Sequence, residues 1–203
     1  DEDTRKYRLG LGLVALAGGK LAQLDIVSVA NPFLKELSEV PGETVPFSVL
    51  YGDDLLYLAK VESAQPVRVA SRIGGSAPLH CSANGKALLA FRPVAEIDRL
   101  LSKPLRRYTP ATIVDPGTIK DDLKRIRAQG YATDVGAYID GVNAVAAPVH
   151  DAQSQVVASI GIVAPATRLN RAKMAAFGKQ VVAAADRIAS GLGWNERRPS
   201  ASD

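Results

Sequence analysis

Apolar residues recur at helical spacing in several parts of the chain. Residues 9–23, LGLGLVALAGGKLAQ, are rich in Ala and Leu and predict a helix. A second helix is expected from Asp25, whose side chain can cap it, and Pro32 is expected to kink or split this helix. The core-facing stripe of the second helix consists of Ile26, Ala30, Phe33, Leu34 and Leu37. Further helices are expected over residues 85–91, 94–101, 118–129 and 168–192.

Other segments have the short, β-branched runs that are typical of strands. The expected strands are residues 44–50, 55–61, 66–73, 143–149 and 155–163. Gly52-Asp53-Asp54 predicts a hairpin between the first two, and Gly74-Gly75 is expected to end the third. The polar segment 150–154 predicts a turn between the last two. Helices that flank an antiparallel sheet indicate an α+β domain.

Composition and charge narrow the class of protein. A chain of 203 residues can bury one good-sized core, and a hydrophobic content of 47% argues against a disordered chain. The net charge of +4 is too small and too scattered to indicate nucleic-acid binding. A single cysteine cannot form an intramolecular disulfide, and there is neither a signal peptide nor an apolar run of about 18 residues. We therefore expect a cytoplasmic protein without a membrane span.

Residues 78–90, PLHCSANGKALLA, raise the question of catalysis. A cysteine nucleophile needs a base within reach and a lowered thiol pKa. His80 immediately precedes Cys81, and in an extended segment adjacent side chains point to opposite sides, so His80 is poorly placed to act as that base. The only other histidine is His150, and a buried structural cysteine is the favoured interpretation.

The same stretch does not match a phosphate loop or a metal site. Gly85-Lys86 lacks the first glycine of a phosphate loop and is followed by Ala87 instead of Ser or Thr. Two histidines about seventy residues apart and one cysteine match no metal-ligand spacing, so neither metal nor cofactor is expected. Ser82 or Asn84 can cap the following helix, whose first N–H groups favour an anion such as a carboxylate. The alternative is a structural helix start that binds nothing.

Six motifs in a fixed order carry a resemblance to a known family. They are YRLGLGLVAL, PFLKELSEVPGETVPFSVL, SRIGGSAPLHCSANGKALLA, YTPATI, LKRIRAQGYATD and GVNAVAAPVHDAQSQVVASIGI. Over about residues 7–193 the chain resembles the effector-binding domain of the IclR family of bacterial transcriptional regulators. Each motif alone is modest, and the six in the order of the family are specific.

The resemblance implies a GAF-like or profilin-like fold that binds an organic acid between sheet and helices. It also implies a sensor of a transcriptional repressor that has no enzymatic activity and forms a homodimer or homotetramer. Operator DNA would be bound only through a winged helix-turn-helix domain that this sequence lacks. Residues 1–24 are then expected to be the end of its wing and the linker helix, residues 25–193 the effector-binding domain, and residues 194–203 a flexible tail.

The resemblance also implies which residues contact the effector. Polar contacts are expected from the loop before the GKALLA helix, from an acidic residue after GYA and from the last two strands. These residues are Ala83, Asn84, Asp134, Ala144, Gly161 and Val163, and the apolar walls are Val69, Ala77 and Val142. Family members that bind very small oxo-acids have Cys or Ser on the last two strands. At the matching positions this chain has Ala144, Gly161 and Val163, whose side chains offer no hydrogen bond, so we expect a larger, partly apolar acid, with aromatic acids included.

Within that pocket the carboxylate is expected on the N–H groups near Ala83 and Asn84, and Asp134 is expected to accept from a hydroxyl of the ligand or a capping backbone group. The hydroxyl of Tyr138 is one candidate for a polar group at the pocket rim, and a surface tyrosine is the favoured interpretation. Two other functions remain open at this point. One is a small hydrolase or acyltransferase built on Cys81 and His150, for which no third orienting residue is identifiable. The other is a GAF-type scaffold that binds no ligand and serves oligomerisation.

Overall fold

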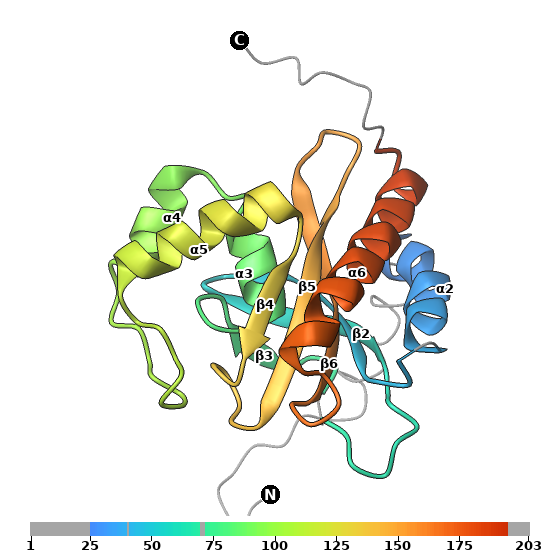
Figure 1. The fold of residues 1–203 in the computed structure, drawn as a ribbon. Coiled ribbons are helices and arrows are strands. Elements are labelled where there is room, and N and C mark those ends of the chain that lie inside the picture. The colour runs from blue at the N-terminus through green and yellow to red at the C-terminus, as the bar shows by residue number, and fades with distance from the viewer. Residues whose placement is uncertain (1–24, 40, 70–71, 195–203) are drawn as a thin grey trace, which may run out of the picture.

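A computed structural model describes residues 25–39, 41–69 and 72–194 (Figure 1). The helix expected over residues 9–23 and the tail expected after residue 194 lie outside the described residues. The helices are α2 (Asp25–Glu39), α3 (Ala83–Leu89), α4 (Val94–Leu101), α5 (Pro116–Gln129) and α6 (Arg171–Gly191). The strands are β1 (Val45–Tyr51), β2 (Asp54–Val61), β3 (Ser76–Pro78), β4 (Ala132–Val135), β5 (Val142–His150) and β6 (Val156–Pro165).

The strands form one antiparallel sheet in the order β3-β2-β1-β6-β5-β4. Tyr51 pairs with Asp54, which confirms the predicted hairpin between β1 and β2. β5 and β6 pair along almost their whole length, with Ala144 opposite Val163. The predicted α+β class with an antiparallel sheet is therefore confirmed.

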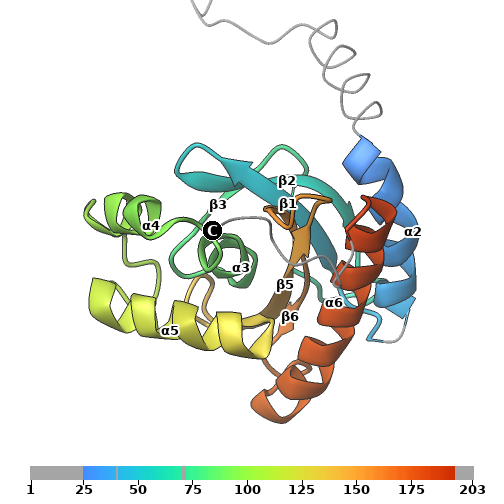
Figure 2. The same ribbon diagram turned by 90° about the horizontal axis from the view of Figure 1, so that it is seen from above.

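Helices cover both faces of the sheet (Figure 2). α2 and α6 lie on one face, and α3, α4 and α5 lie on the other. Successive residues of a strand point to opposite faces, so Val145 of β5 belongs to the α2 and α6 core whereas Ala144 and Ala146 belong to the other core. A strand buried on both faces has an almost unbroken apolar sequence, as β5 does.

Local sequence explains where two of the helices begin and end. Asp115 caps α5 by accepting a hydrogen bond from the backbone N–H of Thr118, and Pro116 occupies the first turn. Gly130 ends α5 with φ of 83°, a left-handed conformation that glycine adopts without strain. Asn170 caps α6 by accepting from the N–H of Lys173.

The structure corrects the predicted third strand. Val67 and Ile73, whose β propensity suggested a strand over residues 66–73, are exposed. At Gly74 the chain turns with φ of 78°, and the third strand is β3, which begins at Ser76 beyond both glycines. The segment before this turn forms no regular strand in residues 66–69 and 72–75.

Two further features differ from the prediction. α2 continues through Pro32, which does not split it. Ala30 and Leu34, on either side of the proline, are fully buried, so packing outweighs the hydrogen bond that proline removes. β4 was not predicted, since four residues are too short to show a period of two.

Candidate functional site

A cavity of about 210 Å³ lies between the sheet and the start of α3. Strands β1, β2, β5 and β6 supply its floor, and the segments on either side of residues 70–71 and after β4 supply its sides. The lining residues are Thr44, Pro46, Tyr57, Val69, Arg72, Gly75, Ser76, Ser82, Ala83, Asn84, Asp134, Tyr138, Ile139, Val142, Ala144 and Val163. The cavity therefore draws on segments that are up to 119 residues apart in sequence between Thr44 and Val163.

The start of α3 forms one buried wall of the cavity. Ser82 is its N-cap: the hydroxyl accepts from the N–H of Gly85 at 3.1 Å and donates to the carbonyl of Pro78 at 2.6 Å. Ser82, rather than Asn84, is thus the capping residue. The N–H groups of Ala83 and Asn84 are in the first turn, where a helix offers no carbonyl partner, so they remain available to a ligand.

The side chain of Asn84 is held against β6. Its amide nitrogen donates to the hydroxyl of Ser159 at 3.2 Å, and that hydroxyl lies 2.9 Å from the hydroxyl of Ser48 on β1. A Cβ atom at Gly161 would lie only 2.7 Å from the amide oxygen of Asn84 and 2.8 Å from the carbonyl of Val145. Glycine at this position therefore makes room for the Asn84 side chain.

Asp134 supplies an acidic group to the cavity. It lies on β4 opposite Ala144, is 4% exposed, and accepts a hydrogen bond from the N–H of Ala137 at 2.7 Å. Burial raises its pKa to about 6, against the opposing effects of that N–H group and of the positive charge of Lys86. Lys86 itself forms a 2.7 Å ion pair with Asp122 of α5.

Seven of the nine predicted contact residues lie on the cavity wall. They are Val69, Ala83, Asn84, Asp134, Val142, Ala144 and Val163. Gly161 lies behind Asn84, and Ala77 on β3 is buried in the core under α3, so these two are not among the lining residues. Their predicted role as direct contacts has no support in the geometry.

Six lining residues with polar or charged side chains were not predicted as effector contacts, namely Thr44, Tyr57, Arg72, Ser76, Ser82 and Tyr138, and three of them have large side chains. Tyr57 projects from β2, and its burial, followed by the nearby Tyr138 and Asp134, raises the pKa of its hydroxyl. Tyr138, expected on the surface, is half-buried and packs edge-on against Tyr108 with ring centroids 5.2 Å apart. Arg72 carries an exposed side chain beside the cavity. Two of the three lie in segments whose structure was predicted wrongly or not at all.

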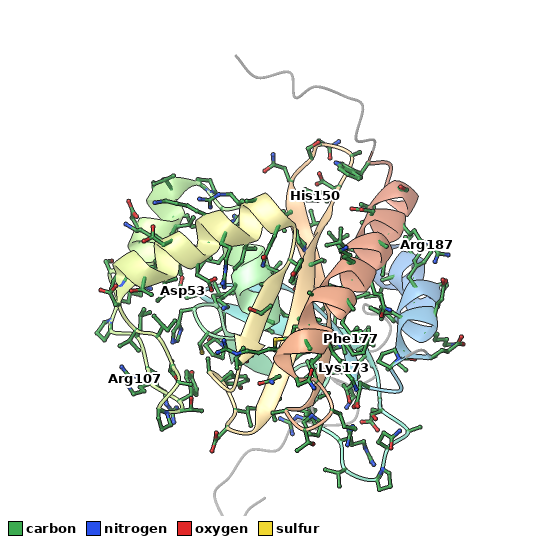
Figure 3. The ribbon with its side chains drawn as sticks, viewed as in Figure 1. Asp53, Arg107, His150, Lys173, Phe177 and Arg187 are labelled. Carbon is green, nitrogen blue, oxygen red and sulfur yellow. The ribbon has the colours of Figure 1, made fainter. Side chains whose placement is uncertain are left out.

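The residues of the predicted catalytic alternative are not assembled for catalysis. Cys81 is 2% exposed, and burial, together with the charge of Asp134, raises the pKa of its thiol to about 12. The ring of His80 lies within 3.0 Å of the carbonyl of Arg106. His150 is at the end of β5, beside the β5–β6 hairpin (Figure 3), where it stacks on Trp194 at 5.5 Å. A protonated thiol without a hydrogen-bonded base is a poor nucleophile.

Metal-binding and membrane-spanning features can be assessed for the same described residues. Among residues 25–39, 41–69 and 72–194, no group of three His, Cys, Asp or Glu side chains is placed to hold a metal ion. No helix within these ranges has both the length and the apolar character needed to cross a bilayer.

Comparison with known sequences gives a match over most of the chain. The family described as "Bacterial transcriptional regulator IclR C-terminal" matches residues 19–190. The HTH-type transcriptional repressor AllR of Klebsiella pneumoniae is 34% identical over 188 residues, which are 92% of this chain and 69% of that protein. The HTH-type transcriptional regulator BhcR of Paracoccus denitrificans is 32% identical over 193 residues, which are 95% of this chain and 69% of that protein.

Solved structures show the same fold. The Thermotoga maritima IclR structure has a TM-score of 0.86 and 30% identity, over 91% of this chain and 75% of that one. An IclR homologue from Microbacterium hydrocarbonoxydans, solved in complex with 4-hydroxybenzoate, has a TM-score of 0.80 and 28% identity, over 91% of this chain and 75% of that one.

Proposed function

The chain belongs to the IclR family of bacterial transcriptional regulators, in which it is the effector-binding domain, and we propose that its effector is an organic acid bound in the cavity between the sheet and α3. One observation carries this proposal: a cavity of about 210 Å³ places a buried carboxyl group, the free N–H groups of a helix start and apolar strand residues around one space. A site that mixes apolar walls with a few converging polar groups is typical of small-molecule recognition.

The proposed polar contacts are Ala83 and Asn84 through their N–H groups and Asp134 through its carboxyl group. Val69, Val142, Ala144 and Val163 are the proposed apolar walls. Gly161 and Ala77 are proposed to act from behind the wall, Gly161 by leaving space for Asn84. We assign direct contacts to the residues that line the cavity and supporting roles to the two that do not.

The size and lining of the cavity favour an acid with an aromatic or other apolar body. An apolar cavity of about 150 Å³ in another protein holds one benzene molecule, so 210 Å³ has room for a ring with polar substituents. Ala144 and Val163 offer no side-chain hydrogen bond to a compact oxo-acid. The ligand of the Microbacterium homologue, 4-hydroxybenzoate, is of this class.

We propose that the domain is a cytoplasmic, non-enzymatic sensor. Its relatives are named as transcriptional regulators, and the raised thiol pKa of Cys81 disfavours the hydrolase alternative. DNA would be bound by a separate winged helix-turn-helix domain. Effector binding can change DNA binding only if the effector prefers one of two arrangements of the whole protein. We propose that these arrangements are those of a homodimer or homotetramer, whose order light scattering would measure.

A thermal-shift screen of the domain against aromatic monocarboxylic acids and glyoxylate tests the proposed function. A ligand at 100 times its dissociation constant stabilises the fold by about 2.7 kcal/mol, which raises the unfolding midpoint measurably. The control is Ala144→Phe, in which a ring occupies the cavity, and it should show no shift.

Stabilisation by an aromatic acid in the wild type alone supports the cavity as the effector site. An equal increase of the unfolding midpoint in Ala144→Phe would indicate that the acid binds outside this cavity. If no acid stabilised the domain, the scaffold alternative would be favoured.

A further inference from the structure

We propose that Arg72 recognises the carboxylate of the effector, and that the opposite end of the effector carries a hydrogen-bond donor directed towards Asp134. The inference rests on the proposed function, because it concerns the same cavity. It names a residue that determines specificity and narrows the ligand class to monocarboxylic acids with a donor such as a hydroxyl at the far end.

The backbone at Arg72 is held in a fixed position next to the cavity. Its carbonyl accepts from the N–H of Gly75 at 2.8 Å and closes a tight turn in which Gly74 has φ of 78°. Two hydrogen bonds join this turn to Tyr57 of β2: the N–H of Gly74 donates to the carbonyl of Tyr57 at 2.9 Å, and the N–H of Tyr57 donates to the carbonyl of Gly75 at 3.0 Å. Arg72 is thus anchored to a strand whose tyrosine also lines the cavity.

Charge is distributed unequally around the cavity. Among its lining residues, only Arg72 and Asp134 carry a formal charge at neutral pH. The side chain of Arg72 is exposed to solvent, whereas Asp134 is 4% exposed. The positive group therefore lies at the mouth and the acidic group lies deep inside.

The guanidinium of Arg72 is available to a ligand. Within residues 25–39, 41–69 and 72–194, no acidic side chain forms an ion pair with it. The other arginines near this segment are engaged: Arg68 lies 3.8 Å from Glu62, and Arg168 binds Glu43 and the carbonyl of Val67. A guanidinium can bind a carboxylate through two parallel hydrogen bonds, which gives direction as well as charge complementarity.

The buried charge of Asp134 sets the orientation of the ligand. α3 packs on β4, so the first turn of α3 and Asp134 belong to the same inner part of the cavity. A ligand carboxylate placed at that first turn would add a second buried negative charge beside Asp134, which is unfavourable. A ligand hydroxyl there instead donates to the Asp134 carboxylate and can accept from the first-turn N–H groups, while the ligand carboxylate meets Arg72 in a solvated position. This orientation is the reverse of the one expected from the helix start alone.

Isothermal titration calorimetry with a matched pair of probes tests the inference. The probes are 4-hydroxybenzoate and the uncharged 4-hydroxybenzamide, and the proteins are the wild type, Arg72→Gln, Arg72→Lys and the control Arg68→Gln, whose side chain is on the same segment but not on the cavity wall. If another acid gives the largest thermal shift, that acid and its amide replace the pair.

We expect Arg72→Gln to weaken binding of the acid about tenfold, because one charge-assisted hydrogen-bonded contact is lost. Binding of the amide should stay unchanged. Arg72→Lys should lose less, and Arg68→Gln should match the wild type. Wild-type affinity of Arg72→Gln for the acid would overturn the inference and leave the proposed function intact. An equal loss for acid and amide would also overturn it, because the effect would not depend on the ligand charge. Failure of the wild type to bind any acid would overturn the proposed function itself.

Discussion

The carboxyl group of Asp134 should make the domain less stable at neutral pH than at acidic pH, and Asp134→Asn should remove this dependence. Asp134 is almost completely buried, and its backbone hydrogen bonds, from the N–H groups of Ala137 and Tyr138, do not offset the desolvation of its charge. An asparagine side chain has nearly the same shape and keeps an oxygen that can accept the same hydrogen bond. The substitution therefore removes the charge with little change in packing.

The magnitude follows from the pKa. Burial raises the pKa of Asp134 from 3.8 to about 6, and this difference corresponds to about 3 kcal/mol. Because the folded-state pKa is raised, the stability it contributes is fully present below pH 3.8 and is lost as the pH rises through about 6. The free energy of unfolding of Asp134→Asn, relative to the wild type, should therefore increase by up to about 3 kcal/mol between acidic and mildly alkaline pH.

Urea denaturation of both proteins at several pH values between about 4 and 8 measures this difference. The wild type and the variant should have equal m-values, which checks that both unfold in two states. Other groups titrate in both proteins and cancel in the comparison. A stability difference that does not vary with pH would refute the proposed burial of a charged Asp134. The same variant should bind the effector more weakly, as expected when a functional group is kept at the expense of stability.

Three other substitutions or labelling experiments test the surroundings of the cavity. Gly161→Ala places a Cβ atom 2.7 Å from the Asn84 amide oxygen and should lower the free energy of unfolding by about 1–3 kcal/mol in urea denaturation; an unchanged midpoint would contradict the close contact. Cys81, with a thiol pKa of about 12, should react with iodoacetamide at pH 8 much more slowly in the native than in the denatured domain, and equal rates would contradict its burial. Lys86→Met removes the 2.7 Å partner of Asp122 but leaves its ion pair with Arg125, so it should destabilise the domain by about 1–2 kcal/mol. The double variant Lys86→Met/Asp122→Leu should recover part of this loss, as thermal denaturation would show.

Features with a local cause could be predicted from the sequence. The helix that ends at Gly130 was predicted because glycine there adopts a left-handed conformation, and the helix that starts after Pro93 was predicted from the proline and the apolar spacing behind it. The structure of the segment after β2 could not be predicted in this way, because Val67 and Ile73 have high β propensity but no partner strand to bury them. Tertiary contacts, rather than propensity, decide such a segment.

The same distinction applies to the site. Asn84 and Asp134 were predicted because they lie in motifs of the family, and the structure places both on the cavity wall. Arg72 was missed because residues 66–73 were predicted as a strand, whereas its position depends on the turn at Gly74. Gly161 was predicted as a contact, but a Cβ atom there would meet Asn84, which is information that only the packing of β6 against α3 contains.

A crystal structure of the domain with its tightest-binding aromatic acid tests the central claim most directly. The account predicts the ligand in the cavity that Asn84, Asp134 and Ala144 line, with its apolar body against Ala144. A second hollow of about 190 Å³, between β2 and α4 and beside His80, offers the clearest alternative location. Ligand bound there, with the first cavity empty, would contradict the account.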